Sequence, residues 1–479
     1  MSWFFLCRKR LAIFVNSDKI IQMRGIKVMK KENTIDMVNG PLLKNIMIFA
    51  VPLMFTNFLQ ILFNAADTVV VGKFAGGNAL AAVGATGSVV FLLTAVFNGL
   101  SVGSNVVVAK LIGSKDDQQV SKAVHTSLFI GIAGGVLLAV LGLFCSKILL
   151  EMMSTPEDII DLSKLYMQIY FLGSICLLVY NFGSAVLRSK GDTKKPLYFL
   201  MISGVINVVL NLFFVIVCHM SVAGVALATV ISEGISAILV IITLAREQDA
   251  TKLELKKLRL DRPIAMEIMR IGIPAGIQGM VFSISNVVIQ SSINSFGSSS
   301  IVAGNSAGSN IEGFVYIGMT AFTQATITFT SQNIGAKNYK NINRILWLTL
   351  VLVIVSGFLV GFIAWYFGDF FLSLYTNETA VVEVGKIRLL YVALFLFLNG
   401  VLDCFVCSMR GMGYSTLPTI LMLISICGVR LLWIYTVFAS YRTLEVIYFC
   451  YPLSWVICSI IQCILWFYLH KHFLKQAQA

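Results

Sequence analysis

Apolar stretches long enough to cross a lipid bilayer recur along this chain from Leu43 to Leu469. A bilayer core needs about 20 mainly apolar residues per spanning helix. These stretches are roughly twice the length of a barrel strand and lack its alternation of apolar and polar residues. Helices and closed barrels are the structures that satisfy every backbone hydrogen bond in lipid. The sequence therefore predicts an all-α polytopic membrane protein.

We expect twelve transmembrane helices, and the composition agrees with that number. Hydrophobic residues make up 58% of the chain and charged residues 12%, whereas soluble domains average about 25% charged residues. The predicted spans are 43–72, 79–109, 121–146, 163–187, 196–218, 222–245, 264–295, 300–333, 343–368, 384–409, 417–439 and 446–469.

The net charge of +13 is explained by an excess of Lys and Arg on one side of the membrane. Of the 36 Lys and Arg residues, 29 lie in the terminal segments and every second loop, six lie on the opposite face, and Arg430 lies inside a span. By the positive-inside rule this bias places both termini in the cytoplasm, with the spans in the cell (inner) membrane. A nucleic-acid-binding protein would gather its charge on one folded surface, so we expect no nucleic-acid partner.

The chain repeats itself with an offset of 222 residues. Pro52 matches Pro274, the segment Ile112–Lys115 (IGSK) matches 334–337 (IGAK), and the segment 188–191 (RSKG) matches 410–413 (RGMG). Six spans thus repeat as six, and because six is even, both halves enter the membrane from the same side. A parallel repeat of this kind is typical of transporters that alternate access between two lobes.

The repeat predicts the domain organisation. It comprises a cytoplasmic N-terminal segment (1–40), an N-lobe (41–245), a cytoplasmic linker (246–263), a C-lobe (264–470) and a cytoplasmic tail (471–479). Residues 1–28 lack a cleavage site for a signal peptide. They are either a flexible tail or an over-extended start, with Met29 as an alternative first residue.

Polar residues inside the spans are the candidates for function, because they are costly in lipid and usually face a cavity or a partner. Asn57, Asn64 and Asp67 share one face of span 1, and Asn207 and Asn211 lie one turn apart on span 5. Together they could bind Na⁺ through oxygens, or hold a proton on Asp67. The alternative is a polar network that only fixes packing.

The other intramembrane ionisable residues are Glu233, Glu312, Asp403 and Arg430. Glu312 and Arg430 lie at similar predicted depths, so they form either a structural ion pair or a coupling site in which Arg430 competes with the cation. Small neighbours favour a packed interhelical hydrogen bond for Glu233. Asp403 has either a helix-end role or a transport role. Met280, Asn286 and Arg430, with Asn57 and Asn64, are candidates to line a substrate cavity.

The pattern resembles the multidrug and toxic compound extrusion (MATE) family. The most specific segments are VPLMFTNFLQILFNAADTVVVGKFAG, LRSKGDTKKP, TSQNIGAKN and MRGMGYSTLP, and the resemblance covers nearly the whole chain after about residue 35. It implies an antiporter that exports drugs or organic cations in exchange for H⁺ or Na⁺. The family's span 1 acid falls on Asp67, and its span 5 Asn and acid fall on Asn207 and Asn211, so the second acid is an amide here.

The resemblance also matches the span 8 Glu of some family branches to Glu312, whereas the span 7 Glu of another branch has no counterpart. Asp67, Asn207, Asn211 and Glu312 are therefore the predicted cation-coupling residues, with Asp67 as the centre of a Na⁺ site if the ion is Na⁺. We expect no cofactor besides the coupling ion. The expected partners are an amphipathic or cationic small-molecule substrate and membrane lipids, and the expected state is a monomer.

Other functions fit the sequence less well. A lipid-linked oligosaccharide flippase of the same broader superfamily would need a more basic cavity, whereas the intramembrane charges predicted here are four acids and one base. An intramembrane enzyme would need paired Asp motifs for Mg²⁺ or an HExxH zinc motif, and neither occurs. We therefore expect a transporter and not an enzyme.

Overall fold

The computed structural model describes residues 35–153 and 155–478, and these contain helices and no strands. The N-terminal segment up to residue 34, including Met29, lies outside this range. The helices of the first half are α2 (Leu42–Val70), α3 (Gly77–Ser114), α4 (Asp117–Met152), α5 (Glu157–Leu172), α6 (Ser174–Ser189), α7 (Lys194–Leu212) and α8 (Ser221–Arg246).

The second half repeats this order with more interruptions. Its helices are α9 (Arg262–Asn294), α10 (Ser299–Gly335), α11 (Lys340–Tyr366), α12 (Gly368–Ser373), α13 (Thr379–Arg388), α14 (Phe397–Gly411), α15 (Thr416–Leu423), α16 (Val429–Trp433) and α17 (Leu444–Gln478). Short π-helical turns extend or join several of these helices: 71–75, 213–217, 389–393, 424–428 and 434–438. Such turns are frequent at functional sites.

All twelve predicted spans coincide with helices or continuous helix pairs. Among the described residues, ten spans are long and apolar enough to cross a membrane, and the pair α5–α6, bent by 45°, makes an eleventh. The remaining predicted span is α10, which has 37 residues but is rich in Ser, Thr, Asn and Gly. Its polar composition fits its position, since α10 packs against α2, α3, α11, α13 and α14 and faces little lipid.

The sequence repeat corresponds to repeated backbone geometry. Lys115 and Lys337, which end the IGSK and IGAK motifs, both adopt a left-handed conformation with φ of 57°. Gly191 and Gly413, which end RSKG and RGMG, have φ of 95° and 91°. Glycine adopts this conformation without the steric penalty that a Cβ brings. The motifs therefore match because the same turns follow spans 2 and 8 and spans 4 and 10.

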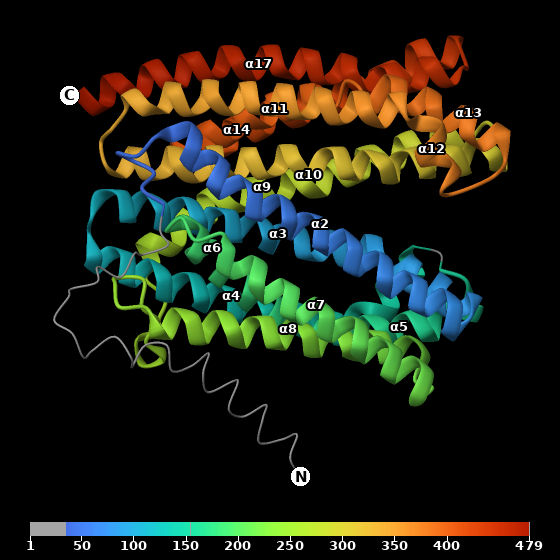
Figure 1. The fold of residues 1–479 in the computed structure, drawn as a ribbon, viewed down its shortest axis with the longest axis horizontal. Helices are drawn as coiled ribbons and strands as arrows, with labels where there is room; N and C mark the ends of the chain where they lie inside the picture. Colours follow the sequence, from blue (N-terminus) through green and yellow to red (C-terminus); the bar gives the residue numbers. More distant parts are fainter. Residues whose placement is uncertain (1–34, 154, 479) are drawn as a thin grey trace, which may run out of the picture. The chain divides into compact units, whose positions relative to one another are not determined.

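Two helices cross from one lobe to the other. The first half of α2, including Ile46 and Phe49, is buried in the hydrophobic core of the second half of the chain, whereas its later part packs on α7 (Figure 1). Conversely, Ile264 and Ile268 of α9 are buried in the core of the first half. Each crossing helix contains a proline, Pro52 or Pro274, at equivalent positions.

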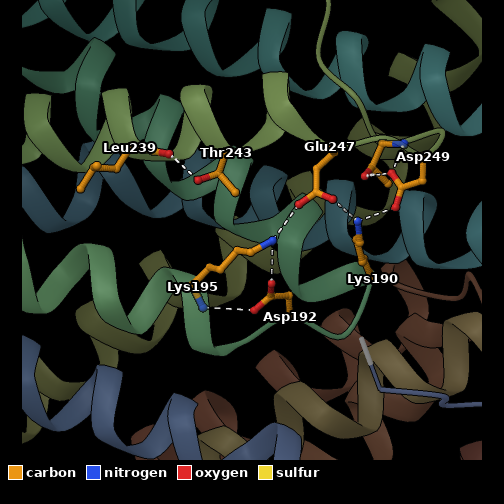
Figure 2. A network of polar contacts seen from close by, with 8 residues as sticks. Lys190, Asp192, Lys195, Leu239, Thr243, Glu247 and Asp249 are labelled. Atoms are coloured by element: carbon orange, nitrogen blue, oxygen red, sulfur yellow. Dashed lines mark hydrogen bonds and ion pairs between the residues drawn. The ribbon is translucent and has the colours of Figure 1, made fainter. Parts of the chain in front are cut away.

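An ionic network holds the start of the linker against the first half (Figure 2). Lys190 donates to Glu247 at 2.6 Å and also to Asp249, and Lys195 donates to Glu247 at 2.7 Å. Asp192 contacts Lys195 at 3.1 Å. Burial by itself would raise the pKa of Glu247, but the hydrogen bonds and charges of the two lysines outweigh it and lower that pKa. The LRSKGDTKKP motif thus contributes both the left-handed turn at Gly191 and the lysines that bind the start of the linker.

Candidate functional site

Asp67 lies in a cavity of about 700 Å³ within the first lobe, half-buried near the end of α2. Asn211 Nδ2 donates to Asp67 Oδ1 and, at 3.2 Å, to Asn207 Oδ1. Asn207 and Asn211 are both buried on α7, and Asn64 lines the same cavity. The structure therefore brings together the acid and the two amides that the sequence placed on separate spans.

A second acid lies in this cavity. Glu233 of α8 lines it, and within the described residues Glu233 Oε2 makes no hydrogen bond of the interhelical kind that was predicted. Among the residues that the structure describes, Glu233 Oε2 and Asn211 Oδ1 are buried acceptors without a hydrogen-bond donor. A buried acceptor left unpaired is destabilising, and a bound cation or proton would satisfy it. The hydrogen bond expected for Glu233 is thus not formed by Oε2, and Glu233 lines the same cavity as Asp67.

Two π-helical turns adjoin this acid–amide cluster. The turn 71–75 begins four residues after Asp67, and the turn 213–217 begins two residues after Asn211. Asn57 lies ten residues before Asp67 on α2, and its Nδ2 donates to Thr320 Oγ1 on α10 at 3.0 Å. Asn57 lines the cavity of the first lobe and at the same time connects the two lobes.

The second lobe holds a cavity of about 570 Å³, lined by Glu312, Asn286, Arg388 and Arg430 among others. Of the two alternatives left open for Glu312 and Arg430, the structural ion pair between them is wrong. Glu312 instead pairs with Arg388, whose Nε and Nη2 donate to the two carboxylate oxygens at 2.7 Å each. Both side chains are buried, with exposed fractions of 7% for Arg388 and 11% for Glu312.

The small residues of α10 make room for this pair. A Cβ at Gly304 would lie 2.6 Å from the carbonyl oxygen of Val381, and a Cβ at Gly308 would lie 3.0 Å from Cδ of Arg388. The two glycines thus let α13 approach α10 closely. Sequence reasoning missed Arg388 because it lies near a predicted span end, where arginine is normally solvated. Its place directly before the apolar segment LLYVALF (389–395) was the available signal.

Arg430 has a different environment from the predicted one. Its guanidinium lies 4.4 Å above the ring of Tyr451, Nε donates to Ser454 Oγ at 3.2 Å, and Nη1 donates to Asn286 Oδ1 at 3.4 Å. Met280 is not among the residues lining either cavity, whereas Phe282 lines the second. Asp403 accepts a hydrogen bond from the Tyr316 hydroxyl at 3.2 Å.

The charge count behind the comparison with a flippase also changes. Arg388 and Arg410 are buried, and Arg188 lines the cavity of the first lobe. Four acids are thus accompanied by four arginines and not by one. The balance differs between the lobes, because the first cavity has two acids and one arginine and the second has one acid and two arginines.

The lobes are in close contact at the end of the molecule that carries the linker. There a Cβ at Gly99 of α3 would lie 2.3 Å from the backbone nitrogen of Gly276 of α9, and Lys110 pairs with Glu267 at 2.8 Å. Nearer the other end of α3, a Cβ added at Gly84 would meet no atom within 4 Å in the described part of the chain.

Twelve spans, two repeated lobes and a polar cavity in each define a polytopic helical membrane transporter. The MatE family profile matches residues 52–213 and again 274–436, once in each lobe and with the second match starting 222 residues after the first. These matches cover well over half of the chain, so the chain belongs to the MatE family. The resemblance and the repeated fold expected from the sequence are thereby confirmed.

Relatives and solved structures agree. The chain is 29% identical over 366 residues to the "Probable multidrug resistance protein YpnP" of Bacillus subtilis (strain 168), covering 76% of this chain and 82% of that protein. It is 27% identical over 412 residues to the "Probable multidrug resistance protein YoeA" of the same organism, covering 84% and 88%. A structure described as "Outward-facing conformation of a multidrug resistance MATE family transporter of the MOP superfamily" has a TM-score of 0.86 at 20% identity, covering 92% of this chain and 99% of that chain.

Proposed function

We propose that this protein is a cation-coupled antiporter that exports drugs or organic cations by alternating access between its two lobes. The observation that carries the proposal is the Asp67–Asn211–Asn207 cluster, with the unpaired acceptors of Asn211 and Glu233 in the same cavity. Carboxylate and amide oxygens suit either a proton or Na⁺. The relatives named as multidrug resistance proteins support the substrate class.

In the proposed cycle, H⁺ or Na⁺ enters from outside and binds at Asp67. It neutralises the carboxylate, changes the hydrogen bond with Asn211, and so alters how α2 packs on α7. Substrate then leaves outward, and the lobes rock so that the linker end opens. Since α2 also packs in the core of the second lobe, a change in α2 reaches both lobes.

In this proposal Glu312 is less suited to bind the coupling cation than its sequence position suggested. Its bidentate hydrogen bonds to Arg388 occupy both carboxylate oxygens. A cation would have to displace a buried guanidinium there, whereas no cation from the protein contacts Asp67 in the described residues. Asp67 is therefore the principal coupling residue, and Glu312 the second candidate.

A lipid-linked oligosaccharide flippase is the alternative function, and the basic cavity of the second lobe favours it more than the sequence did. The cavity sizes weigh against it. Volumes of about 570 and 700 Å³ lie in the range of sites for drug-sized ligands, about 300–1,000 Å³. We further propose a monomer in the cell (inner) membrane with both termini cytoplasmic, in contact with lipid along its apolar spans, and without enzymatic activity.

The test is transport of ethidium in proteoliposomes under an imposed pH or Na⁺ gradient. We expect gradient-driven transport by the wild type and at least a tenfold loss in Asp67→Asn. Asp158→Asn, which removes an exposed carboxylate from α5, is the matched control and should transport normally. Full gradient-driven transport by Asp67→Asn would refute the coupling role, and ethidium movement without gradient dependence would indicate a channel or facilitator.

A further inference from the structure

Arg430 carries a buried charge that the protein does not neutralise. Its exposed fraction is 5%, yet among the described residues it pairs with no carboxylate. A guanidinium has five N–H donors, and the side-chain contacts of Arg430 are the two to Ser454 and Asn286, the second a long one at 3.4 Å. The Tyr451 ring offers the guanidinium a cation–π contact but no negative charge.

The neighbouring acid is not available to Arg430. Glu312 is the one carboxylate in the lining of this cavity, and both of its oxygens accept hydrogen bonds from Arg388. Arg388 also donates to Asn305, which accepts from the Tyr448 hydroxyl as well. Glu312 and Arg388 thus neutralise each other, and the positive charge of Arg430 remains uncompensated in the cavity lining.

The same helices have opposite polarity in the two lobes. With the offset of 222 residues, Arg430 matches Val208, the neighbour of Asn207, and Ile289 matches Asp67. Asn286, the partner of Arg430, matches Asn64. Neither charge is repeated at its equivalent position, so the matched helices carry an acid with amides in the first lobe and a guanidinium with an amide in the second. Two π-helical turns, 424–428 and 434–438, flank the short helix that carries Arg430.

We propose that the cavity of the second lobe binds the anionic group of an amphipathic small molecule, a carboxylate or a sulfonate, at Arg430 with Asn286 beside it. The guanidinium is planar and presents paired donors that match such groups. Phe282, Ile289, Leu396 and Trp455 line the same cavity and supply apolar and aromatic surface for the rest of the ligand. The transporter then accepts organic anions or zwitterions in addition to cations.

This inference extends the substrate class of the proposed transporter, but its test is equilibrium binding and needs no gradient. A failure of coupling at Asp67 would therefore leave the result intact. The probe is fluorescein, an aromatic carboxylate, followed by fluorescence anisotropy with the purified full-length protein in detergent. Ethidium is the cationic probe in parallel.

Two kinds of comparison are needed. On the unchanged protein, benzenesulfonate should displace fluorescein, whereas benzyltrimethylammonium, similar in size and opposite in charge, should not. Among variants, Arg430→Gln should weaken fluorescein binding at least tenfold and leave ethidium binding unchanged. Arg430→Lys, which keeps the charge but loses the paired donors, should retain only part of the affinity for fluorescein. Arg442→Gln, which removes an exposed charge outside the cavity, is the control and should bind both probes normally.

Several outcomes would overturn the proposal. Unchanged fluorescein binding by Arg430→Gln would do so, and so would equal weakening of both probes, which is the mark of a purely structural arginine. Displacement of fluorescein by benzyltrimethylammonium would show that the site does not distinguish anionic from cationic ligands. Displacement by phosphatidylglycerol added as mixed micelles with the detergent, but not by benzenesulfonate, would assign the site to a lipid headgroup. Should Arg430→Gln fail to fold, the ligand comparison on the unchanged protein still decides.

Discussion

Removing one member of the Glu312–Arg388 pair should destabilise the protein strongly. Arg388→Met would leave the Glu312 carboxylate buried without its two hydrogen bonds of 2.7 Å. Breaking a buried ion pair from one side costs about 3–5 kcal/mol, because the remaining charge is uncompensated. Glu312→Gln should cost less than Arg388→Met, since an amide still accepts a hydrogen bond from the guanidinium.

The double variant separates the pair from its surroundings. Two charge-assisted hydrogen bonds contribute roughly 1.5–3 kcal/mol each, and some of this survives in the singles, so we expect a coupling energy of about 2–3 kcal/mol. The assay is unfolding by sodium dodecyl sulfate titration in mixed micelles, followed by tryptophan fluorescence. The free energy of unfolding is compared for the wild type, both singles and the double.

The chain offers a matched control two residues away. Lys386 pairs with Asp369 at a similar distance, 2.8 Å, but both side chains are exposed, at 43% and 70%. Exposed pairs typically contribute about 0–1 kcal/mol. If the coupling energy of Glu312 with Arg388 is no larger than that of Lys386 with Asp369, the argument from burial is refuted.

Two further predictions concern the lobe contact and the linker. Gly276→Ala should weaken the contact between α3 and α9, because the Cβ of position 276 would lie 2.5 Å from Cα of Val96. A cysteine introduced at Ser101 should then react faster with a water-soluble maleimide, and unchanged labelling would contradict a tight contact. The folded-state pKa of Glu247 is lowered below its ordinary value of 4.5, so its stabilisation is present above that value and lost as the pH falls through the folded-state pKa. Glu247→Gln should therefore lower the melting temperature at pH 7, and the difference from wild type should shrink on acidification towards pH 4; a difference that grows would show the sign to be wrong.

The sequence by itself determined the fold class and the repeat. Hydropathy over 20-residue windows reflects the transfer of whole helices into lipid, so it is insensitive to details of packing. The left-handed turns at Gly191 and Gly413 are local backbone requirements, and they remain visible as matched motifs even where side chains diverge. The cluster of Asp67 with Asn211 was also predictable, because each residue lies with other polar residues on one face of an otherwise apolar span.

Only the tertiary structure decided the partners of the buried charges. Similar depth in the membrane suggested Arg430 for Glu312, but depth does not specify which helix faces which. Gly304 and Gly308 let α13 pack closely against α10, so Arg388, and not Arg430, hydrogen-bonds to Glu312. Likewise, Glu233 joins Asp67 because of how α8 is placed around the first cavity. A hydrogen-bonded ion pair forms only when its two groups approach within about 3 Å, so it depends on helix rotation and approach, and a linear sequence carries that information only indirectly.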